Sequence, residues 1–203
     1  MVRAGKNSAR AKKRLVEWMK RLFENGKRKV TAGCEWVAAG GGMATEMVDG
    51  ECCAVIGGVL YRRCVAKYGQ HIPKVAIAAQ ETDKSGNRAY WLPIDARKES
   101  DRWFVQAWIN TPWMGDLKLG EADGVYEAVG LHFKGNPYGL DADFLEKHGR
   151  RRIPDFPRDY YGIRDYFRAH EDLYGVVFWK DGEPKCEVKR TDFGLEWPEK
   201  GGE

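Results

Sequence analysis

The first clear pattern of apolar positions is helical and lies near the start of the chain. Within residues 8–25, apolar side chains recur three and four positions apart, at Leu15, Trp18, Met19, Leu22 and Phe23. Lys and Arg fill the other side, which is typical of an amphipathic helix. Ser8 could cap its start and Gly26 its end, so we predict a helix over 8–25.

From residue 44 the pattern changes to short apolar runs separated by turn residues, which indicates strands. Gly57-Gly58 and Lys180-Asp181-Gly182 predict hairpin turns. Helices are predicted at 101–109 and 162–169. Together these segments predict an α+β fold with antiparallel strands. The predicted strands are 44–48, 52–56, 59–63, 75–80, 90–94, 125–133, 174–179 and 186–189.

Composition narrows the classes of protein that remain. The 203 residues include eight Trp, nine Tyr and eight Phe, which excludes disorder throughout. No apolar run reaches 18 residues, so we expect neither a transmembrane helix nor a membrane partner. There is no apolar stretch near the start, so a secretory signal is not expected. The pattern indicates no oligomeric state.

Charge is unevenly distributed along the chain. Residues 1–30 hold eleven Lys or Arg against two Glu, a net charge of +9, and the whole chain carries +4. The remaining residues therefore carry −5. A basic arm on a slightly acidic body often meets nucleic acid, but it can equally be a solvated helix face or an organelle-targeting segment.

Cysteines and histidines give no metal pattern. The five cysteines are odd in number and contain no C-x-x-C, which favours neither a zinc site nor a disulfide framework. A reducing, cytoplasmic location is the simplest expectation. The four histidines are scattered. These residues are Cys34, Cys52, Cys53, Cys64 and Cys186, with His71, His132, His148 and His170.

Three blocks carry chemistry. They are A-T-E-M-V-D-G-E-C-C from Ala44, Y-E-A-V-G at Tyr126 with G-N-P-Y-G-L at Gly135, and Y-G-V-V-F-W at Tyr174 with V-K-R-T-D-F-G-L-E-W-P at Val188. In this order they resemble motifs of the ATP-dependent RNA ligases of the RNA ligase 1 type, which belong to the covalent nucleotidyltransferases. The resemblance runs from about residue 32 to residue 198.

The resemblance implies a nucleotidyltransferase fold built on antiparallel sheets, with the predicted N-terminal helix added. The domains expected are a basic arm at 1–30, a ligase-like domain at 31–198 and a tail at 199–203. In such ligases a lysine attacks the α-phosphate of ATP and forms lysyl-AMP. AMP then passes to an RNA 5′-phosphate, and a 3′-hydroxyl displaces it. The implied cofactors are ATP and Mg²⁺, and the implied partners are RNA and ATP.

Position by position, the match is incomplete at three places. Met47 stands at the nucleophile position and has no amine. Tyr174 stands where the family has a metal-binding Glu, and Glu187 stands where it has a phosphate-contacting Lys. Because these departures affect nucleophile, metal and phosphate together, they suggest a ligase relative without adenylylation activity. A Lys-to-Met variant of an active ligase and an interaction protein that inherited the fold are the alternatives. A substitute nucleophile at Cys52 or Cys53 is a further one, as is a two-residue shift of register at Glu187, which Lys185 and Lys189 bracket.

The remaining positions match the family's pattern. Glu127 is also implied as a metal contact and Lys189 as a phosphate contact. Candidate RNA contacts are Lys12, Lys13 and Arg14 in the arm and Arg150, Arg151 and Arg152, although the second cluster could be a solvated loop. Asp49-Gly50 alone could be a tight turn, while Cys52, Cys53, Trp179 and Trp197 are expected in the core. The implied nucleotide contacts are Glu46, Asp49, Gly50, Arg62, Arg63, Tyr126, Glu127 and Lys189.

Overall fold

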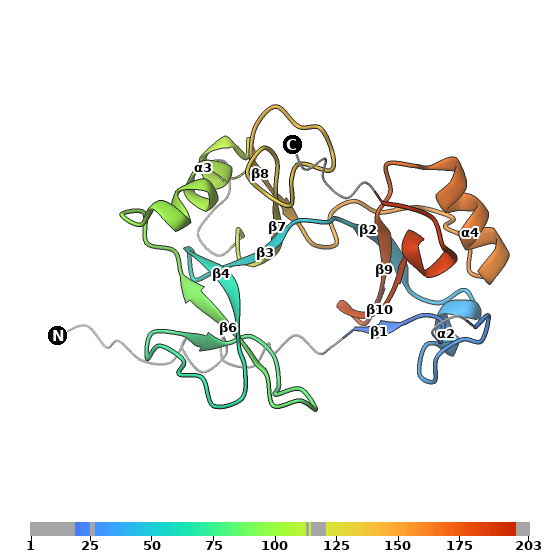
Figure 1. The fold of residues 1–203 in the computed structure, drawn as a ribbon. Coiled ribbons are helices and arrows are strands. Elements are labelled where there is room, and N and C mark those ends of the chain that lie inside the picture. The colour runs from blue at the N-terminus through green and yellow to red at the C-terminus, as the bar shows by residue number, and fades with distance from the viewer. Residues whose placement is uncertain (1–18, 25–26, 113, 115–120, 198–203) are drawn as a thin grey trace.

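Two mainly antiparallel β-sheets lie side by side in the computed structural model, and the chain passes from one to the other at residues 48–50 (Figure 1). The structure describes residues 19–24, 27–112, 114 and 121–197. The mixed α+β class with mostly antiparallel strands is thus confirmed. In the described ranges, no helix is long and apolar enough to cross a bilayer.

The smaller sheet has four strands in the order β1-β10-β9-β2. Only β1 runs parallel to its neighbour, because it pairs with β10 from the far end of the sequence. The hairpin predicted at Asp181-Gly182 joins β9 to β10 and is confirmed. The bounds are β1 Lys20–Arg21, β10 Glu183–Lys189, β9 Gly175–Lys180 and β2 Met43–Met47.

The larger sheet has six strands in the order β5-β6-β4-β3-β7-β8, and every neighbouring pair is antiparallel. The hairpin at Gly57-Gly58 joins β3 to β4, as predicted. The bounds are β5 Ile77–Ala78, β6 Arg88–Pro93, β4 Val59–Ala66, β3 Glu51–Ile56, β7 Gly124–Val129 and β8 Phe144–Lys147.

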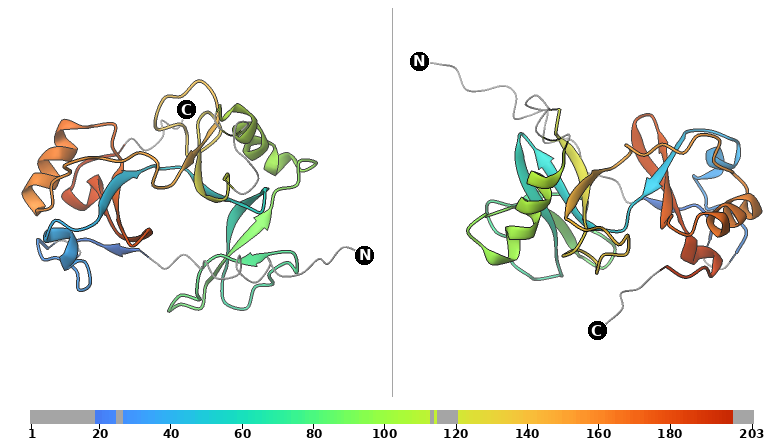
Figure 2. Two further views of the ribbon diagram at one scale, coloured as in Figure 1. Left: turned by 180° about the vertical axis from the view of Figure 1, so that it is seen from behind. Right: turned by 90° about the horizontal axis from the view of Figure 1, so that it is seen from above.

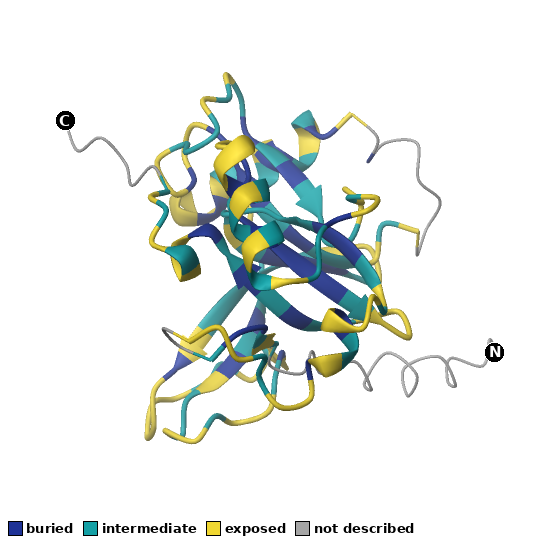
Figure 3. Cartoon of the chain, turned by 90° about the vertical axis from the view of Figure 1, so that its right-hand side faces the viewer, coloured by how far each residue is buried: buried dark blue, intermediate teal, exposed yellow. Residues whose placement is uncertain are grey.

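Helices cover the outer face of each sheet, so the other two faces are turned toward the middle of the molecule (Figures 1 and 2). Buried apolar residues line these helix–sheet contacts (Figure 3). The Asp159 carboxylate caps α4 by accepting hydrogen bonds from the backbone N–H groups of Tyr161 and Gly162. The helical elements are α2 Glu35–Ala38 and α4 Tyr160–Ala169 on the small sheet, α3 Arg102–Asn110 with η1 Glu99–Asp101 on the large one, and η2 Arg190–Phe193 after β10.

The helix predicted over 8–25 is wrong at its described end. Residues 20–21 form β1, and Phe23 makes a β-bridge to Val30. Leu22 is fully buried, and its N–H donates to the Glu187 carbonyl, so sheet pairing overrides the helical pattern. Residues 8–18 and 25, and the tail 199–203, lie outside the described residues.

Other differences are smaller. The strand predicted over 125–133 ends at Val129, because Gly130 turns the chain at φ +126°. The short elements α2 and β8 were not predicted, since each is four residues long and shows no clear periodicity.

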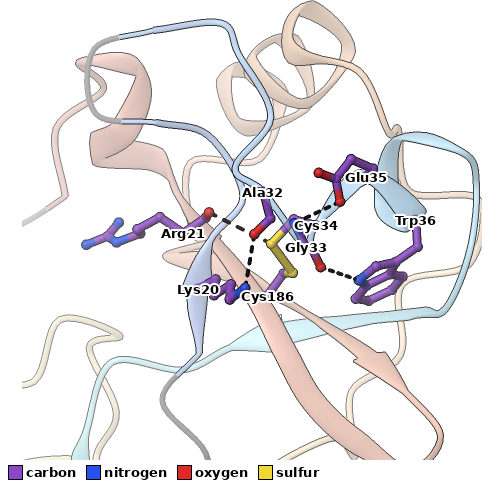
Figure 4. Close-up of a disulfide and its surroundings, with 8 residues drawn as sticks. All are labelled: Lys20, Arg21, Ala32, Gly33, Cys34, Glu35, Trp36 and Cys186. Atoms are coloured by element: carbon purple, nitrogen blue, oxygen red, sulfur yellow. Dashed lines mark hydrogen bonds between the residues drawn. A yellow bond between two sulfur atoms is a disulfide. The ribbon is translucent and has the colours of Figure 1, made fainter. Parts of the chain in front are cut away.

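A disulfide joins Cys34, at the start of α2, to Cys186 in β10 (Figure 4). Both residues are fully buried. The cysteine count did not predict this bridge, because partners 152 residues apart are recognisable only once the sheet brings β10 beside the N-terminal segment. The free thiols among the described residues are Cys52, Cys53 and Cys64. One disulfide does not by itself assign a compartment.

Candidate functional site

The chain crosses from one sheet to the other at Val48-Asp49-Gly50. Strand β2 ends at Met47 in the small sheet, and β3 begins at Glu51 in the large one. The alternative interpretation of Asp49-Gly50 as a tight turn between strands is therefore wrong, because the two strands belong to different sheets and do not pair. Gly50 is required because a Cβ there would lie 2.6 Å from the Ala128 carbonyl and 2.8 Å from Glu127 Cβ. The crossover thus packs directly on β7.

Residues from three distant segments meet beside this crossover. Met47 of β2 and Lys189 of β10 both lie directly opposite Gly175 of β9. A Cβ on Gly175 would lie 3.2 Å from the Met47 sulfur, so the Met47 side chain lies over this glycine. Tyr174 precedes Gly175, and the Lys189 ammonium lies 5.1 Å from the centre of its ring. The sheet therefore brings Met47, Tyr174 and Lys189 together.

Asp49 is held from two sides by aromatic residues. The Trp197 indole N–H donates to Asp49 Oδ2 at 3.1 Å, and the Asp49 backbone N–H donates to the Tyr138 hydroxyl at 2.6 Å. Burial raises the pKa of Tyr138 well above its usual value. The rings of Tyr138 and Tyr174 both pack against Trp197, with centroids 5.4 and 5.2 Å away. Trp197, expected in the core, is instead half-buried at this site.

A cavity of about 350 Å³ opens at this place. Its walls combine the end of β2, the loop at Pro137-Tyr138, the segment at Arg151 and the turn between α4 and β9. Met47, Tyr138, Tyr174 and Trp197 all contribute to the lining. A thioether and aromatic rings can bind a flat apolar or aromatic group by contact, but none of them supplies an amine nucleophile.

Glu127 lies on the inner face of the large sheet. His148 Nε2 is 2.9 Å from Glu127 Oε1, and the Glu127 side chain is only 13% exposed. Burial raises the pKa of Glu127, while the hydrogen bond from His148 opposes this effect. Cys52 is its register partner, and burial raises the pKa of the Cys52 thiol. A thiol kept protonated in this way is a poor substitute nucleophile. Cys52 is only partly buried and packs against a small cluster that includes Ala54 and Trp91, whereas Cys53 is fully buried in the core.

Glu187 occupies β10 two residues before Lys189, where the resemblance implies a lysine. Its carboxylate lies 3.3 Å from Arg21 Nε, and its side chain is 13% exposed. Burial raises the pKa of Glu187 although Lys189 and Arg21 both act to lower it. The basic partner of Glu187 thus comes from β1.

The two arginines predicted to bind nucleotide lie on opposite faces of the large sheet. Arg62 makes an ion pair with buried Asp101 at 3.3 Å, on the face that α3 covers. Tyr126 is fully buried on that same face. Arg63 lies on the inner face, where it donates a hydrogen bond to the Gln80 side chain at 2.5 Å. The structure therefore brings Arg63 to the Glu127 face, but not Arg62 or Tyr126.

The basic cluster at 150–152 runs beside β2. Arg151 bridges Glu46, at 3.2 Å, and Glu146 of β8, at 2.6 Å, so it links the two sheets. Arg150 and Arg152 are exposed next to it. The other predicted RNA contacts, Lys12, Lys13 and Arg14, lie outside the described residues.

The residues present do not fit the magnesium site that the resemblance implies. In the described part of the chain, no group of three or more His, Cys, Asp or Glu side chains could hold a metal ion. Tyr174 offers a phenol rather than a carboxylate, and Glu127 Oε1 is engaged by His148. Hard divalent cations need several oxygen ligands, so no step is assigned to Mg²⁺. For ATP, the aromatic walls fit a base better than a triphosphate.

Several residues of the site were not predicted. Tyr138 and Trp197 lie inside the blocks that carry the family resemblance. For Tyr138, its place in the turn-rich stretch Gly135–Leu140 was the signal that could have identified it as a site residue. His148, His170, Glu171 and Asp172 gave no signal, because only the fold brings their loops beside Met47 or Glu127.

Comparison with known proteins adds no relative: no family model matches the chain, and no curated protein matches it.

Proposed function

We propose that this chain is an RNA ligase-like protein of the nucleotidyltransferase fold that binds RNA or ATP and does not form lysyl-AMP. One observation carries the proposal. Met47, Gly175 and Lys189 are register partners on adjacent strands, with Tyr174 beside them. The first and third of the blocks that resemble ligase motifs are thus neighbours in one sheet, and the second block meets the first through Tyr138, whose hydroxyl accepts a hydrogen bond from the Asp49 backbone N–H. A shared nucleotide site requires such an arrangement.

The chemistry at this place supports binding without covalent transfer. A phosphoramidate needs a primary amine, and a methionine thioether has none. The amine of Lys189 lies over the Tyr174 ring rather than at the Met47 position. The Glu187 carboxylate on the same face of the sheet would repel a phosphate that approaches Lys189. We therefore assign no adenylyl transfer to these residues.

Support for RNA as the partner comes from position and charge. Arg150 and Arg152 are exposed on the segment that also supplies Arg151 and Ile153 to the cavity wall. Exposed arginines contact phosphates through charge and hydrogen bonds, independent of sequence. An RNA end in the cavity would place its adjoining phosphates near these two side chains.

Adenylylation tests this proposal. The chain is incubated with α-labelled ATP and Mg²⁺ and resolved by denaturing electrophoresis, alongside Met47→Lys and the triple variant Met47→Lys, Tyr174→Glu, Glu187→Lys. We expect no label on the natural chain or the single variant, and label on the triple variant, which regains all three groups. Met43→Lys, in the same strand, is the matched control and should stay unlabelled.

Other outcomes separate the alternatives. Label on the natural chain would overturn the proposal. Label and nick sealing by Met47→Lys alone would instead favour a Lys-to-Met form of an active ligase. If the natural chain bound neither RNA nor ATP, the inherited fold would serve another interaction.

A further inference from the structure

The cavity beside Met47 has walls of aromatic rings that meet at an angle. Tyr138 and Tyr174 pack on Trp197 with ring planes inclined by 59° and 55°. All three rings line the cavity and are half-buried. Rings that meet at such angles present faces as well as edges to a shared space. Face contacts of this kind attract positive charge, because the face of an aromatic ring is electron-rich.

Two of these rings already contact cations of the chain itself. The Lys189 ammonium lies 5.1 Å from the Tyr174 centroid, and the Arg190 guanidinium carbon lies 5.9 Å from that of Trp197. Both distances are within the range of a cation–π contact. Among the described residues, neither cation belongs to the lining of the cavity. These rings therefore accept positive charge from the protein, in addition to any that a ligand brings.

The charges around the cavity favour a cationic ligand as well. Its lining includes the carboxylates of Glu46, Glu171 and Asp172. Of the described lining residues, only Arg151 carries a permanent positive charge, and it is paired with Glu46 and Glu146. Glu171 and Asp172 are exposed at the rim, where they can accept N–H groups of a ligand. A phosphate placed against Glu171 and Asp172 would be repelled by their carboxylates.

Size and surroundings select a nucleobase. A volume of about 350 Å³ lies at the lower end of the range for small-molecule pockets, and it exceeds what a single methylated ammonium group fills. Exposed Arg150 and Arg152 adjoin the same wall and suit the phosphates that follow a base. We propose that this cavity binds a positively charged, N-methylated purine of the 7-methylguanine type at an RNA end. This proposal rests on RNA binding as proposed above.

A matched pair of ligands tests whether the positive charge on the base increases its affinity for the cavity. 7-Methylguanosine and guanosine have nearly the same shape, but only the first carries the positive charge on its base. Both are titrated into the full chain and followed by quenching of tryptophan fluorescence and by calorimetry. We expect 7-methylguanosine to bind roughly tenfold or more tightly, as one desolvated cation–π contact provides. Equal affinity, or tighter binding of guanosine, would overturn the proposal.

Variants of the walls locate the binding. Tyr174→Leu removes a ring that packs on Trp197, and should weaken 7-methylguanosine binding about fivefold or more while guanosine binding changes little. Glu171→Gln with Asp172→Asn should reduce the preference for the charged base. Tyr68→Leu is the matched control, because Tyr68 is 85% exposed and does not line the cavity. An equal loss in this control would contradict binding at the cavity.

Further ligands distinguish binding of a cationic base from general RNA binding and from binding of a protein partner. A short RNA with an unmodified 5′ end that binds as tightly as one with a 7-methylguanosine end would overturn the cation proposal and leave RNA binding intact. Failure of both RNAs to bind would overturn this proposal and would also remove RNA as the partner in the proposed function, which would then rest on ATP alone. A trimethyl-lysine peptide that binds more tightly than 7-methylguanosine would overturn the choice of a nucleobase and assign the rings to a protein partner.

Discussion

The Trp197 indole donates a hydrogen bond to the Asp49 carboxylate across 148 residues of sequence. It connects the segment after η2 to the crossover between the two sheets. Because Asp49 also donates its backbone N–H to Tyr138, the crossover is held by two aromatic residues from separate loops. The position of Met47, two residues earlier, depends on this arrangement.

Trp197→Phe should destabilise the fold by about 1–2 kcal/mol, since it keeps a ring but leaves Asp49 without its indole donor. Urea unfolding followed by circular dichroism measures the change in free energy of unfolding.

Asp49→Asn keeps an acceptor oxygen and should lower the free energy of unfolding less than Asp49→Ala does. Equal costs for these two Asp49 variants would show that the hydrogen bond contributes nothing.

Glu127→Gln should change how stability depends on pH. Burial raises the folded-state pKa of Glu127 above the usual 4.5, so the folded chain binds this proton more tightly than the unfolded chain does. The resulting stabilisation is full below pH 4.5 and is lost as the pH rises through the raised pKa. Relative to the natural chain, Glu127→Gln should therefore gain stability over that interval. A difference in free energy of unfolding that stays constant with pH would contradict this placement of Glu127.

Local features of the fold could be predicted from the sequence, whereas features that depend on distant contacts could not. The Gly57-Gly58 pair and the Asp181-Gly182 pair, each between short apolar runs, correctly predicted both hairpins, because turn and strand signals are local. The helical spacing of Leu22 and Phe23 led to the wrong prediction of a helix, because pairing of β1 with β10 depends on a contact more than 160 residues away. The face that Arg62 occupies, and the bridge from Cys34 to Cys186, likewise depend on register and tertiary contact.

Reduction of the Cys34–Cys186 bridge should lower stability by about 2–4 kcal/mol, because the bridge closes a long loop in the unfolded chain. Thermal melting of Cys34→Ser against the natural chain measures this cost. Cys64→Ser is the matched control, since Cys64 is a free thiol. Alkylation of the denatured, unreduced chain should modify three of the cysteines, namely Cys52, Cys53 and Cys64. Modification of all five would contradict the bridge.

Gly50→Ala should destabilise the fold by about 3 kcal/mol, because the added methyl group would overlap backbone and side-chain atoms of β7. Gly57→Ala is the control: it has open space around its Cβ position, and its positive φ of +59° alone should cost about 1 kcal/mol. Denaturant midpoints for the two variants measure the difference. If the two costs were the same, the crossover would not pack on β7 as described.

Binding of RNA or ATP without covalent transfer can be measured on one divided sample. The natural chain is mixed with labelled ATP, or with labelled 5′-phosphorylated RNA, in the presence of Mg²⁺. Half is passed through a protein-retaining filter under native conditions, and half is run on a denaturing gel. We expect RNA or ATP to be retained on the filter and no label to remain on the denatured chain. Label that survives denaturation would overturn the proposed absence of covalent transfer, and no retention of either ligand would overturn the proposed binding.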